Sequence, residues 1–247
     1  MSVKKQRLDQ ILFNRNLAES KTKAQAIIMA GQVFVDGKNI NKSGFNINSN
    51  AAIEIKDLGP EWVSRGAYKL LTALEKNKII VRNKICIDLG SSTGGFTDVL
   101  IQSGAHKVYA VDVGTNQLHE KLKKNNKVIS LEKTNARYLK KDQFEELIDV
   151  MVCDVSFISL KKVIEPNLHL LKDKSVIIAL IKPQFESKKN ETKKGVVKDS
   201  TIHQRICNEI TEWFKTIGHT KILSIIESPI KGPKGNTEFL ITVKYQK

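Results

Sequence analysis

Two features that define large classes of protein are missing from this chain of 247 residues: a long apolar run and a cysteine framework. A membrane-spanning helix needs roughly 18 consecutive apolar residues, and the longest apolar candidate, residues 176–181, has the length of a strand. No apolar stretch follows the basic N-terminus, so no secretory signal is expected. The three cysteines form no C-x-x-C pair, which argues against a disulfide framework or a zinc site. We expect a cytoplasmic protein with reduced core cysteines and no metal.

Acidic residues are also in deficit. The chain has 41 Lys and Arg against 26 Asp and Glu, a net charge of +15. Residues 1–56 carry +5 and the remainder +10, so the positive charge is not confined to a tail. Such an excess favours polyanionic partners, either nucleic acid or an anionic membrane surface. Apolar residues make up 40% and recur along the whole chain, which predicts a folded protein.

The chain divides near a polar Gly-Pro segment, and we predict a first domain at 1–56, a linker at 57–66 and a second domain at 67–247. In the first domain, apolar residues at helical spacing predict two helices. Ser20 is the expected N-cap of the second helix and Gly31 its expected stop. The Asp36-Gly37 pair then predicts a hairpin between short strands. This is a small module for an independent core.

The second domain alternates between Val- and Ile-rich runs and helix-length segments. This alternation is typical of βαβ units and predicts an α/β fold with a mainly parallel sheet. The lysine-dense segment 187–198 is the best candidate for a loop. The predicted strands are 85–89, 107–112, 127–131, 148–153, 175–181, 221–226 and 238–243, and the predicted helices are 67–77, 95–103, 115–124, 159–171 and 200–216.

A glycine-rich turn, Asp88 to Phe96, follows the first strong strand and opens a helix. Small residues there let backbone N–H groups approach a ligand at the carboxyl end of a strand. The spacing matches neither G-x-x-x-x-G-K-[ST] nor G-x-G-x-x-G. Asp112 ends the next strand, 22 positions after Gly90, where an acid can accept hydrogen bonds from ribose hydroxyls. Together these residues predict a nucleoside-containing cofactor.

The run D-L-G-x-x-x-G-G-F resembles the cofactor loop of class I S-adenosylmethionine methyltransferases of the FtsJ-like, ribose 2′-O branch. The first segment resembles the RNA-binding domain of ribosomal protein S-four, although Lys21 stands where that family usually has Arg and loses the two-pronged phosphate contact. With the runs S-R-G-A-Y-K-L, C-D-V-S-F-I-S, K-P-Q-F-E and G-N-T-E-F, the chain is similar to the TlyA family of rRNA cytidine 2′-O-methyltransferases, historically labelled haemolysins.

This resemblance implies the fold, the cofactor and the partner. It implies a class I, Rossmann-like methyltransferase domain with a seven-stranded, mostly parallel sheet and a small α+β N-terminal RNA-binding domain. The implied cofactor is S-adenosylmethionine, and the implied partner is ribosomal RNA or a ribosomal subunit. The implied reaction is methylation of a cytidine ribose 2′-hydroxyl.

The resemblance also implies a catalytic tetrad of Lys69, Asp154, Lys182 and Glu238. A ribose 2′-hydroxyl must lose its proton as it attacks, so the site needs a base and enforced geometry. Our hypothesis makes Lys182 the base, because burial and a second cation such as Lys69 favour the neutral form of a lysine. Asp154 would orient Lys182 but would also favour its charged form, so the two effects compete; Glu238 would hold Lys69 or the ribose. Spacing alone does not bring Lys69 and Glu238 to the other two.

Further residues are candidates for binding. Phe157 could border the cofactor, but for isolated aromatics such as Phe96 and Phe157 core packing is the better expectation. Phosphate contacts by Lys and Arg supply sequence-independent RNA affinity; segment 187–198 either clamps RNA as a mobile loop or only adds solubility, and Arg65 either contacts a ligand or stabilises the linker. The cofactor candidates are Asp88, Gly90, Ser91, Ser92, Thr93, Gly94, Gly95, Phe96, Asp112, Asn135, Ala136 and Asp154, and the RNA candidates are Arg7, Arg15, Lys21, Lys23, Arg65, Lys188, Lys189, Lys193 and Lys194.

Four other functions compete with this one. The first is a non-catalytic RNA- or ribosome-binding factor, against which the intact tetrad and loop argue. The second is a base methyltransferase, but no Asn/Asp-Pro-Pro-aromatic run follows the fourth strand, and Cys153 is expected in a buried strand. The third is a pseudouridine synthase, which would need a different catalytic domain. The fourth is a membrane-active haemolysin, which no amphipathic or membrane-spanning segment supports.

Overall fold

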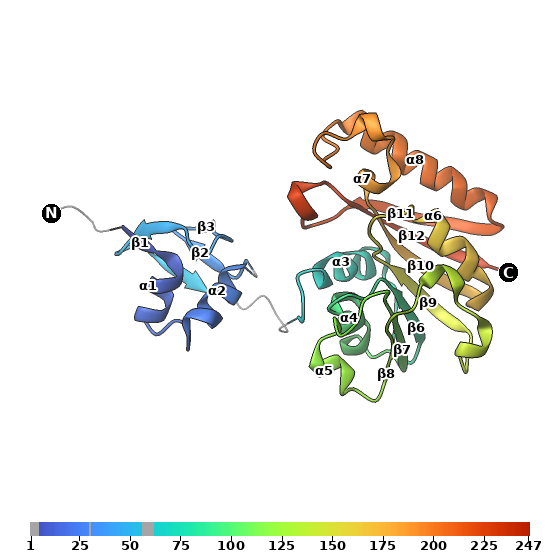
Figure 1. The fold of residues 1–247 in the computed structure, drawn as a ribbon, viewed down its shortest axis with the longest axis horizontal. Coiled ribbons are helices and arrows are strands. Elements are labelled where there is room, and N and C mark those ends of the chain that lie inside the picture. The colour runs from blue at the N-terminus through green and yellow to red at the C-terminus, as the bar shows by residue number, and fades with distance from the viewer. Residues whose placement is uncertain (1–4, 30, 56–61) are drawn as a thin grey trace. The chain divides into compact units, whose positions relative to one another are not determined.

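The structure, a computed structural model, describes residues 5–29, 31–55 and 62–247, apart from the side chains of Lys189 and His219. The chain forms two compact units, residues 1–61 and 62–247 (Figure 1). Of the predicted linker, residues 57–61 lie outside the described residues, and residues 62–66 belong to the second unit.

The first unit packs two helices against short strands. Ser20 accepts a hydrogen bond from the Lys23 backbone N–H at 3.0 Å, and Gly31 follows the second helix with φ +77°, so the predicted cap and stop are confirmed. Asp36 and Gly37 both have positive φ, as the predicted two-residue hairpin requires. The elements are β1 (Lys5–Arg7), α1 (Leu8–Asn14), α2 (Lys21–Met29), β2 (Val33–Val35), β3 (Lys38–Asn39), β4 (Asn46–Asn48) and β5 (Ile53–Ile55).

The second unit is built on a seven-stranded sheet with the order β11-β12-β10-β9-β6-β7-β8. The pairs from β10 to β8 are parallel, and β12 is antiparallel to both of its neighbours. The predicted fold class is therefore confirmed. The strands are β6 (Ile85–Leu89), β7 (Lys107–Val111), β8 (Val128–Leu131), β9 (Ile148–Cys153), β10 (Leu171–Ile181), β11 (His219–Glu227) and β12 (Phe239–Gln246).

Helices cover both faces of this sheet, because alternate residues of its buried strands are apolar on both sides. Within β6, Cys86 packs on the face covered by α3 and α4, while Ile87 and Leu89 pack on the face of α6 and α8. All three cysteines are buried and free, as predicted. The helices are α3 (Ala67–Asn77), α4 (Gly95–Gln102), α5 (Glu120–Lys123), α6 (Lys161–Ile164), α7 (Pro183–Glu186) and α8 (Ser200–Thr216).

Several predicted bounds are wrong for local physical reasons. The predicted helix 115–124 contains only α5, which begins after His119, whose side chain accepts from the Lys121 N–H as an N-cap. The predicted helix 159–171 is interrupted, since Pro166 has no N–H to donate and a 3₁₀ turn follows α6. β10 begins at Leu171 rather than 175, through an irregularity in its pairing with β9.

The predicted loop 187–198 has local structure of its own. It contains a 3₁₀ turn at Lys189–Glu191 and an antiparallel bridge between Lys193 and Val196. No helix in the described part of the chain is long and apolar enough to cross a membrane.

Candidate active site

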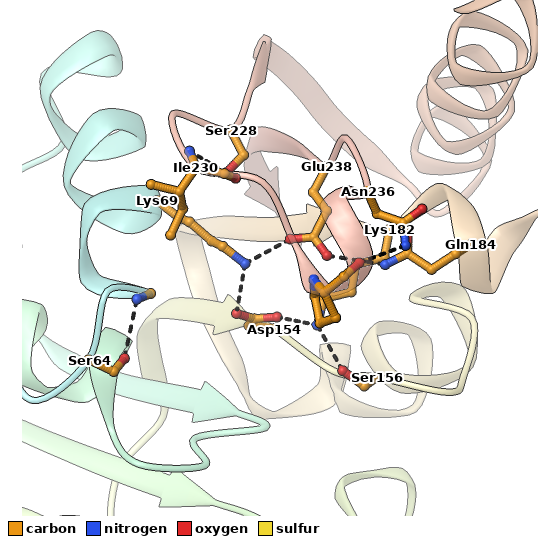
Figure 2. A network of polar contacts seen from close by, with 12 residues as sticks. Ser64, Lys69, Asp154, Ser156, Lys182, Gln184, Ser228, Ile230, Asn236 and Glu238 are labelled. Carbon is orange, nitrogen blue, oxygen red and sulfur yellow. Dashed lines mark hydrogen bonds and ion pairs between the residues drawn. The ribbon is translucent and has the colours of Figure 1, made fainter. Parts of the chain in front are cut away.

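Four charged side chains from distant parts of the chain meet at one edge of the sheet (Figure 2). Asp154 follows β9 and Lys182 follows β10, so the parallel strands deliver both to their carboxyl ends. Glu238 immediately precedes β12, and because β12 is antiparallel its start lies at the same edge. Lys69 reaches Glu238 and Asp154 from the first turn of α3.

The four side chains form a continuous chain of opposite charges. Lys69 Nζ lies 2.7 Å from Glu238 Oε2 and 3.7 Å from Asp154 Oδ2. Lys182 Nζ lies 2.6 Å from Asp154 Oδ1 and donates a hydrogen bond to Ser156 Oγ at 2.9 Å. Lys69 and Lys182 are 7% and 8% exposed and Glu238 is fully buried. Buried charges require partners, and here two cations and two carboxylates balance.

Three supporting residues escaped the sequence interpretation: Ser156, Gln184 and Gly232. Gln184 Nε2 donates to Glu238 Oε1 at 3.2 Å, and a Cβ at Gly232 would overlap that same carboxylate. Ser156 and Gln184 each stand two positions after a predicted catalytic residue, inside the motifs that carried the family resemblance. Their position in these motifs could have identified both as site residues from the sequence. Gly232 had no comparable signal, because its role depends on a contact across the site.

The short helix α7 is fastened to the loop that follows Asp154. The partly buried carboxylate of Glu186 accepts hydrogen bonds from the Ser159 hydroxyl and from the Leu160 N–H, both at 2.7 Å. Burial raises the pKa of Glu186, and these two hydrogen bonds partly oppose that shift. Because α7 directly follows Lys182, this contact fixes the loop and the lysine relative to one another.

The expectation that Phe157 packs in the core is wrong. Phe157 is 90% exposed and has φ +64°, a left-handed turn, and its ring lies against Phe185 of α7 with centroids 4.9 Å apart. Phe96, by contrast, is buried against the α3–α4 face of the sheet, as expected of an isolated aromatic.

The glycine-rich turn after β6 is held close to the tetrad. Gly90 has φ +85°, and a Cβ there would lie 2.7 Å from the Asp154 carbonyl oxygen, so a larger residue does not fit. The carboxylate of Asp112 accepts hydrogen bonds from the backbone N–H groups of Ser92 at 2.8 Å and Gly114 at 2.7 Å. Asp112 therefore fixes the turn besides being the predicted ribose acceptor.

Two neighbouring cavities lie along this turn, of about 190 Å³ and about 410 Å³. Gly90, Ser92, Asp154 and Ser156 line both, so the cavities are parts of one cleft. Gly94, a predicted cofactor residue, lines neither; a Cβ there would overlap Leu122, so this glycine serves packing. The predicted cofactor residues that line the cleft are Asp88, Gly90, Ser91, Ser92, Thr93, Gly95, Phe96, Asp112, Asn135, Ala136 and Asp154.

Comparison with known proteins agrees with this geometry. The FtsJ-like methyltransferase family matches residues 62–245, and the S4 domain matches residues 6–53. The chain belongs to the FtsJ-like methyltransferase family. The implied S-four-type module and the implied methyl donor, S-adenosylmethionine, are thereby confirmed.

Similar proteins cover nearly the whole chain. Hemolysin A of Brachyspira hyodysenteriae is 42% identical over 236 residues, which are 95% of this chain and 98% of that protein. The 16S/23S rRNA (cytidine-2'-O)-methyltransferase TlyA of Mycobacterium tuberculosis H37Rv is 37% identical over 242 residues, 97% of this chain and 90% of that one. A solved structure from Streptococcus thermophilus is 37% identical, covers 100% of this chain and 90% of its own, and has a TM-score of 0.76.

The cleft of this FtsJ-like methyltransferase fits the methyl donor at a specific atom. Asp88 is fully buried and lines the smaller cavity; Thr97 donates to its Oδ2 at 2.7 Å, while Oδ1 has no hydrogen-bond partner among the described residues. Burial, with the nearby Asp154 carboxylate, raises the pKa of Asp88 to about 7. A buried acceptor without a partner suits the amino group of S-adenosylmethionine.

The segment before α3 forms one wall of the cleft. Asp98 of α4 accepts a hydrogen bond from the Val63 N–H at 3.0 Å. Ser64 and Gly66 line the smaller cavity, and a Cβ at Gly95 would overlap Ser64. The part of the predicted linker that the structure describes is therefore built into the wall of the cleft, with Arg65 exposed.

Two predicted RNA contacts in the first unit have intramolecular partners. Arg7 donates to both carboxylate oxygens of Asp9, at 3.0 and 2.6 Å. Arg15 donates to the carbonyl oxygens of Ala51 at 3.0 Å and Ser49 at 2.5 Å. Arg15 therefore links the end of α1 to the segment before β5, whereas the Arg7 pair is local. Lys21 and Lys23 are exposed on α2.

Segment 187–198 is anchored beside the tetrad rather than free of it. Glu191 pairs with Arg205 at 2.7 Å, and Asn236 Nδ2 donates to the Gly195 carbonyl at 3.0 Å. His203 bonds the Val197 carbonyl at 2.9 Å. The lysines Lys188, Lys193 and Lys194 are exposed, and the side chain of Lys189 lies outside the described residues.

Metal ligands do not cluster in the described residues, where no group of three or more His, Cys, Asp or Glu side chains gathers.

Proposed function

We propose that this chain methylates the ribose 2′-hydroxyl of a cytidine in ribosomal RNA, with S-adenosylmethionine as donor. The observation that carries the proposal is the buried chain of two lysines and two carboxylates at the mouth of the cofactor cleft. The relative named as a 16S/23S rRNA (cytidine-2'-O)-methyltransferase supports the choice of nucleotide and substrate. An rRNA substrate in turn supports a cytoplasmic location.

Lys182 is the proposed base. The 2′-hydroxyl is a weak nucleophile and must lose its proton as its oxygen bonds to carbon. S-adenosylmethionine, when bound, supplies an electrophilic methyl group on a sulfonium. Lys182 Nζ is held between the Asp154 carboxylate and the Ser156 hydroxyl, which fixes its direction. In its neutral form it takes the hydroxyl proton.

Lys69 and Glu238 are proposed to position the other pair. Glu238 is fully buried and holds Lys69 Nζ at 2.7 Å, and Lys69 in turn lies 3.7 Å from the second oxygen of Asp154. Both oxygens of Asp154 are thus directed by a lysine. Enforced geometry of this kind accounts for a large share of many enzymatic rate enhancements.

The exposed ring of Phe157 beside the cleft supports an RNA substrate. Phe157 lies in the lining of the larger cavity and packs against Phe185. An exposed ring offers a stacking surface to an unstacked nucleobase, the form in which single-stranded RNA is commonly recognised.

Ribose methylation of isolated ribosomal subunits tests the function. Purified chain, S-adenosylmethionine and unmodified subunits are combined, and 2′-O-methyl positions are mapped on the recovered rRNA. A methylated cytidine ribose supports the proposal. Methylation on a base, or no methylation although calorimetry shows cofactor binding, contradicts it.

Two substitutions test the base. Lys182→Ala removes the amine, and Lys182→Arg keeps a cation beside Asp154 that does not deprotonate. Both are expected to lower turnover about 10²–10⁴-fold, with S-adenosylmethionine affinity and melting temperature near wild type for Lys182→Arg. The exposed Lys162→Ala is the matched control. Turnover retained by Lys182→Arg would refute the assignment.

A further inference from the structure

A second cavity lies at the other end of the sheet from the tetrad, where β10 and β11 begin and β12 ends, near the C mark in Figure 1. Its volume is about 500 Å³. Three of its six lining residues are lysines and none is acidic. The lining residues are Lys174, Thr220, Lys221, Lys244, Tyr245 and Gln246.

Two of these lysines are placed against each other. Lys221 and Lys244 are direct partners on the antiparallel pair β11–β12. Side chains at such positions lie about 4.5–5.5 Å apart at Cβ, and like charges there are destabilising. Both are exposed, and neither has an ion-pair partner among the described residues. The sheet therefore presents uncompensated positive charge at this point.

Lys174 joins them through an irregular backbone. It has φ +59°, a left-handed conformation that side chains rarely adopt, in the stretch where the β9–β10 register shifts. The neighbouring carboxylate of Asp173 accepts a hydrogen bond from the backbone N–H of Lys247 at 3.1 Å.

Two other lysines at this end of the sheet differ from these three because each pairs with a carboxylate. Lys84 and Lys172 lie 3.4 and 3.1 Å from the two oxygens of Asp149. Those two are compensated within the protein, whereas the three at the cavity are not. The contrast leaves the positive charge at the cavity available to an anion from outside the chain.

We propose that this cavity binds a phosphate of the RNA substrate, an inference that rests on the proposed function. A phosphodiester supplies a negative charge and acceptor oxygens for the lysine ammonium groups and the Tyr245 hydroxyl. Lys182 stands eight positions after Lys174 along β10 and its end, a distance of about 26 Å at 3.3 Å per residue. A substrate that contacts both the cavity and the tetrad must therefore span this distance. An extended or folded RNA, such as the rRNA of a ribosomal subunit, is long enough to do so.

Salt-dependent binding of the full chain to ribosomal subunits tests the site. Each lost phosphate contact lowers the slope of log affinity against log salt by about 0.7–0.9. Because the cavity is proposed to hold one phosphate, Lys221→Ala/Lys244→Ala is expected to lower the slope by about 0.7–0.9 and to raise KM for subunits, with kcat unchanged. Lys221→Arg/Lys244→Arg should restore the slope.

The matched control removes the same charge elsewhere. Lys124 and Lys127 are exposed near β8, the outer strand on the side of the sheet away from β11. Lys124→Ala/Lys127→Ala should leave the slope unchanged. Equal slopes for the two double variants, with both melting like wild type, overturn the proposal. The proposal is also overturned if Lys221→Ala/Lys244→Ala keeps the wild-type slope but no longer binds inorganic phosphate or anionic vesicles. That result would assign the cavity to a free anion or to a lipid surface. Methylation by the wild-type chain reports the proposed function separately.

Discussion

At Asp88 the demands of folding and of cofactor binding oppose each other. Its Oδ1 is buried without a partner among the described residues, and burial raises its pKa to about 7. Because the folded pKa lies above the unfolded value of 3.8, the ionised form is disfavoured in the folded state. The protonated carboxyl of Asp88 therefore contributes fully to the free energy of unfolding below pH 3.8. This contribution is lost as pH rises toward 7.

Asp88→Asn should separate these demands. We expect a higher melting temperature than wild type at pH 8, with little difference at pH 4. S-adenosylmethionine affinity should fall about 10–100-fold, because the variant loses a hydrogen bond to a charged group. Wild-type affinity should also fall below pH 7 as Asp88 is protonated, and that dependence should vanish in the variant. Calorimetry at several pH values measures both; a pH-independent wild-type affinity would contradict this account.

Asp9 shows the reverse electrostatics in the first unit. Its hydrogen bonds from Arg7 hold its pKa at about 2, below the usual 3.8, although burial opposes the shift. A lowered carboxylate pKa stabilises the fold above pH 3.8, and the contribution is lost as pH falls through 2.

Asp9→Asn should lower the free energy of unfolding of the first unit by about 1 kcal/mol at pH 7. This is the usual contribution of a hydrogen bond between a carboxylate and a half-exposed arginine. The difference from wild type should shrink as pH approaches 2. Denaturant titration of the full chain, followed by a probe in the first unit, measures it. The exposed Glu19→Gln is the control, and an equal loss in both variants would mean that the pair contributes nothing.

At the scale of elements, α7 has importance beyond its four residues. Lys182 precedes it, Gln184 bonds Glu238, Phe185 packs on Phe157 and Glu186 holds the loop after Asp154. One turn of helix thus contacts several separate parts of the site. Its position determines the relative placement of Lys182, Asp154 and Phe157.

Glu186→Ala should therefore lower kcat about tenfold or more, since small misplacements of reacting groups are costly, while cofactor affinity stays unchanged. Glu186→Gln keeps an acceptor and should lose less. Single-turnover methylation together with cofactor calorimetry distinguishes positioning from general unfolding. Glu212→Ala, which removes only an exposed pair with Lys215, should behave as wild type.

The sequence predicted elements best where one pattern dominated. The helices at 67–77 and 200–216 and the strands at 85–89 and 148–153 have the predicted bounds, because an amphipathic period defines the helices and a mostly apolar run defines the strands. Where local chemistry competed, as at Pro166, the prediction failed. The helix α7 was not predicted at all, because four residues are too few for a periodic signal.

The site was predictable only in part. Asp154 and Lys182 could be placed at one edge from parallel-strand topology. Glu238 required the antiparallel direction of β12, and Lys69 required the packing of α3 against the sheet; both are set by long-range contacts and not by local pattern. The exposure of Phe157 depends on a left-handed residue, and the sequence offered no signal for it.

The whole molecule consists of two units, each with its own buried apolar cluster. Residues 62–247 alone should therefore fold and bind S-adenosylmethionine as the full chain does. Affinity for ribosomal subunits should fall at least about tenfold, because the lost residues carry net positive charge and phosphate contacts dominate affinity. Calorimetry and subunit binding measure the two properties; unchanged subunit affinity would show that the first unit contributes nothing to RNA binding.

The neutral set of buried charges at the tetrad limits how this chain can change. Removing one member leaves its partner uncompensated in the interior, at a cost of about 3–5 kcal/mol. Removing both members of the Lys69–Glu238 pair avoids that cost. An evolving lineage that abandons the reaction is therefore expected to shed these residues two at a time, and descendants with a lone survivor should be scarce.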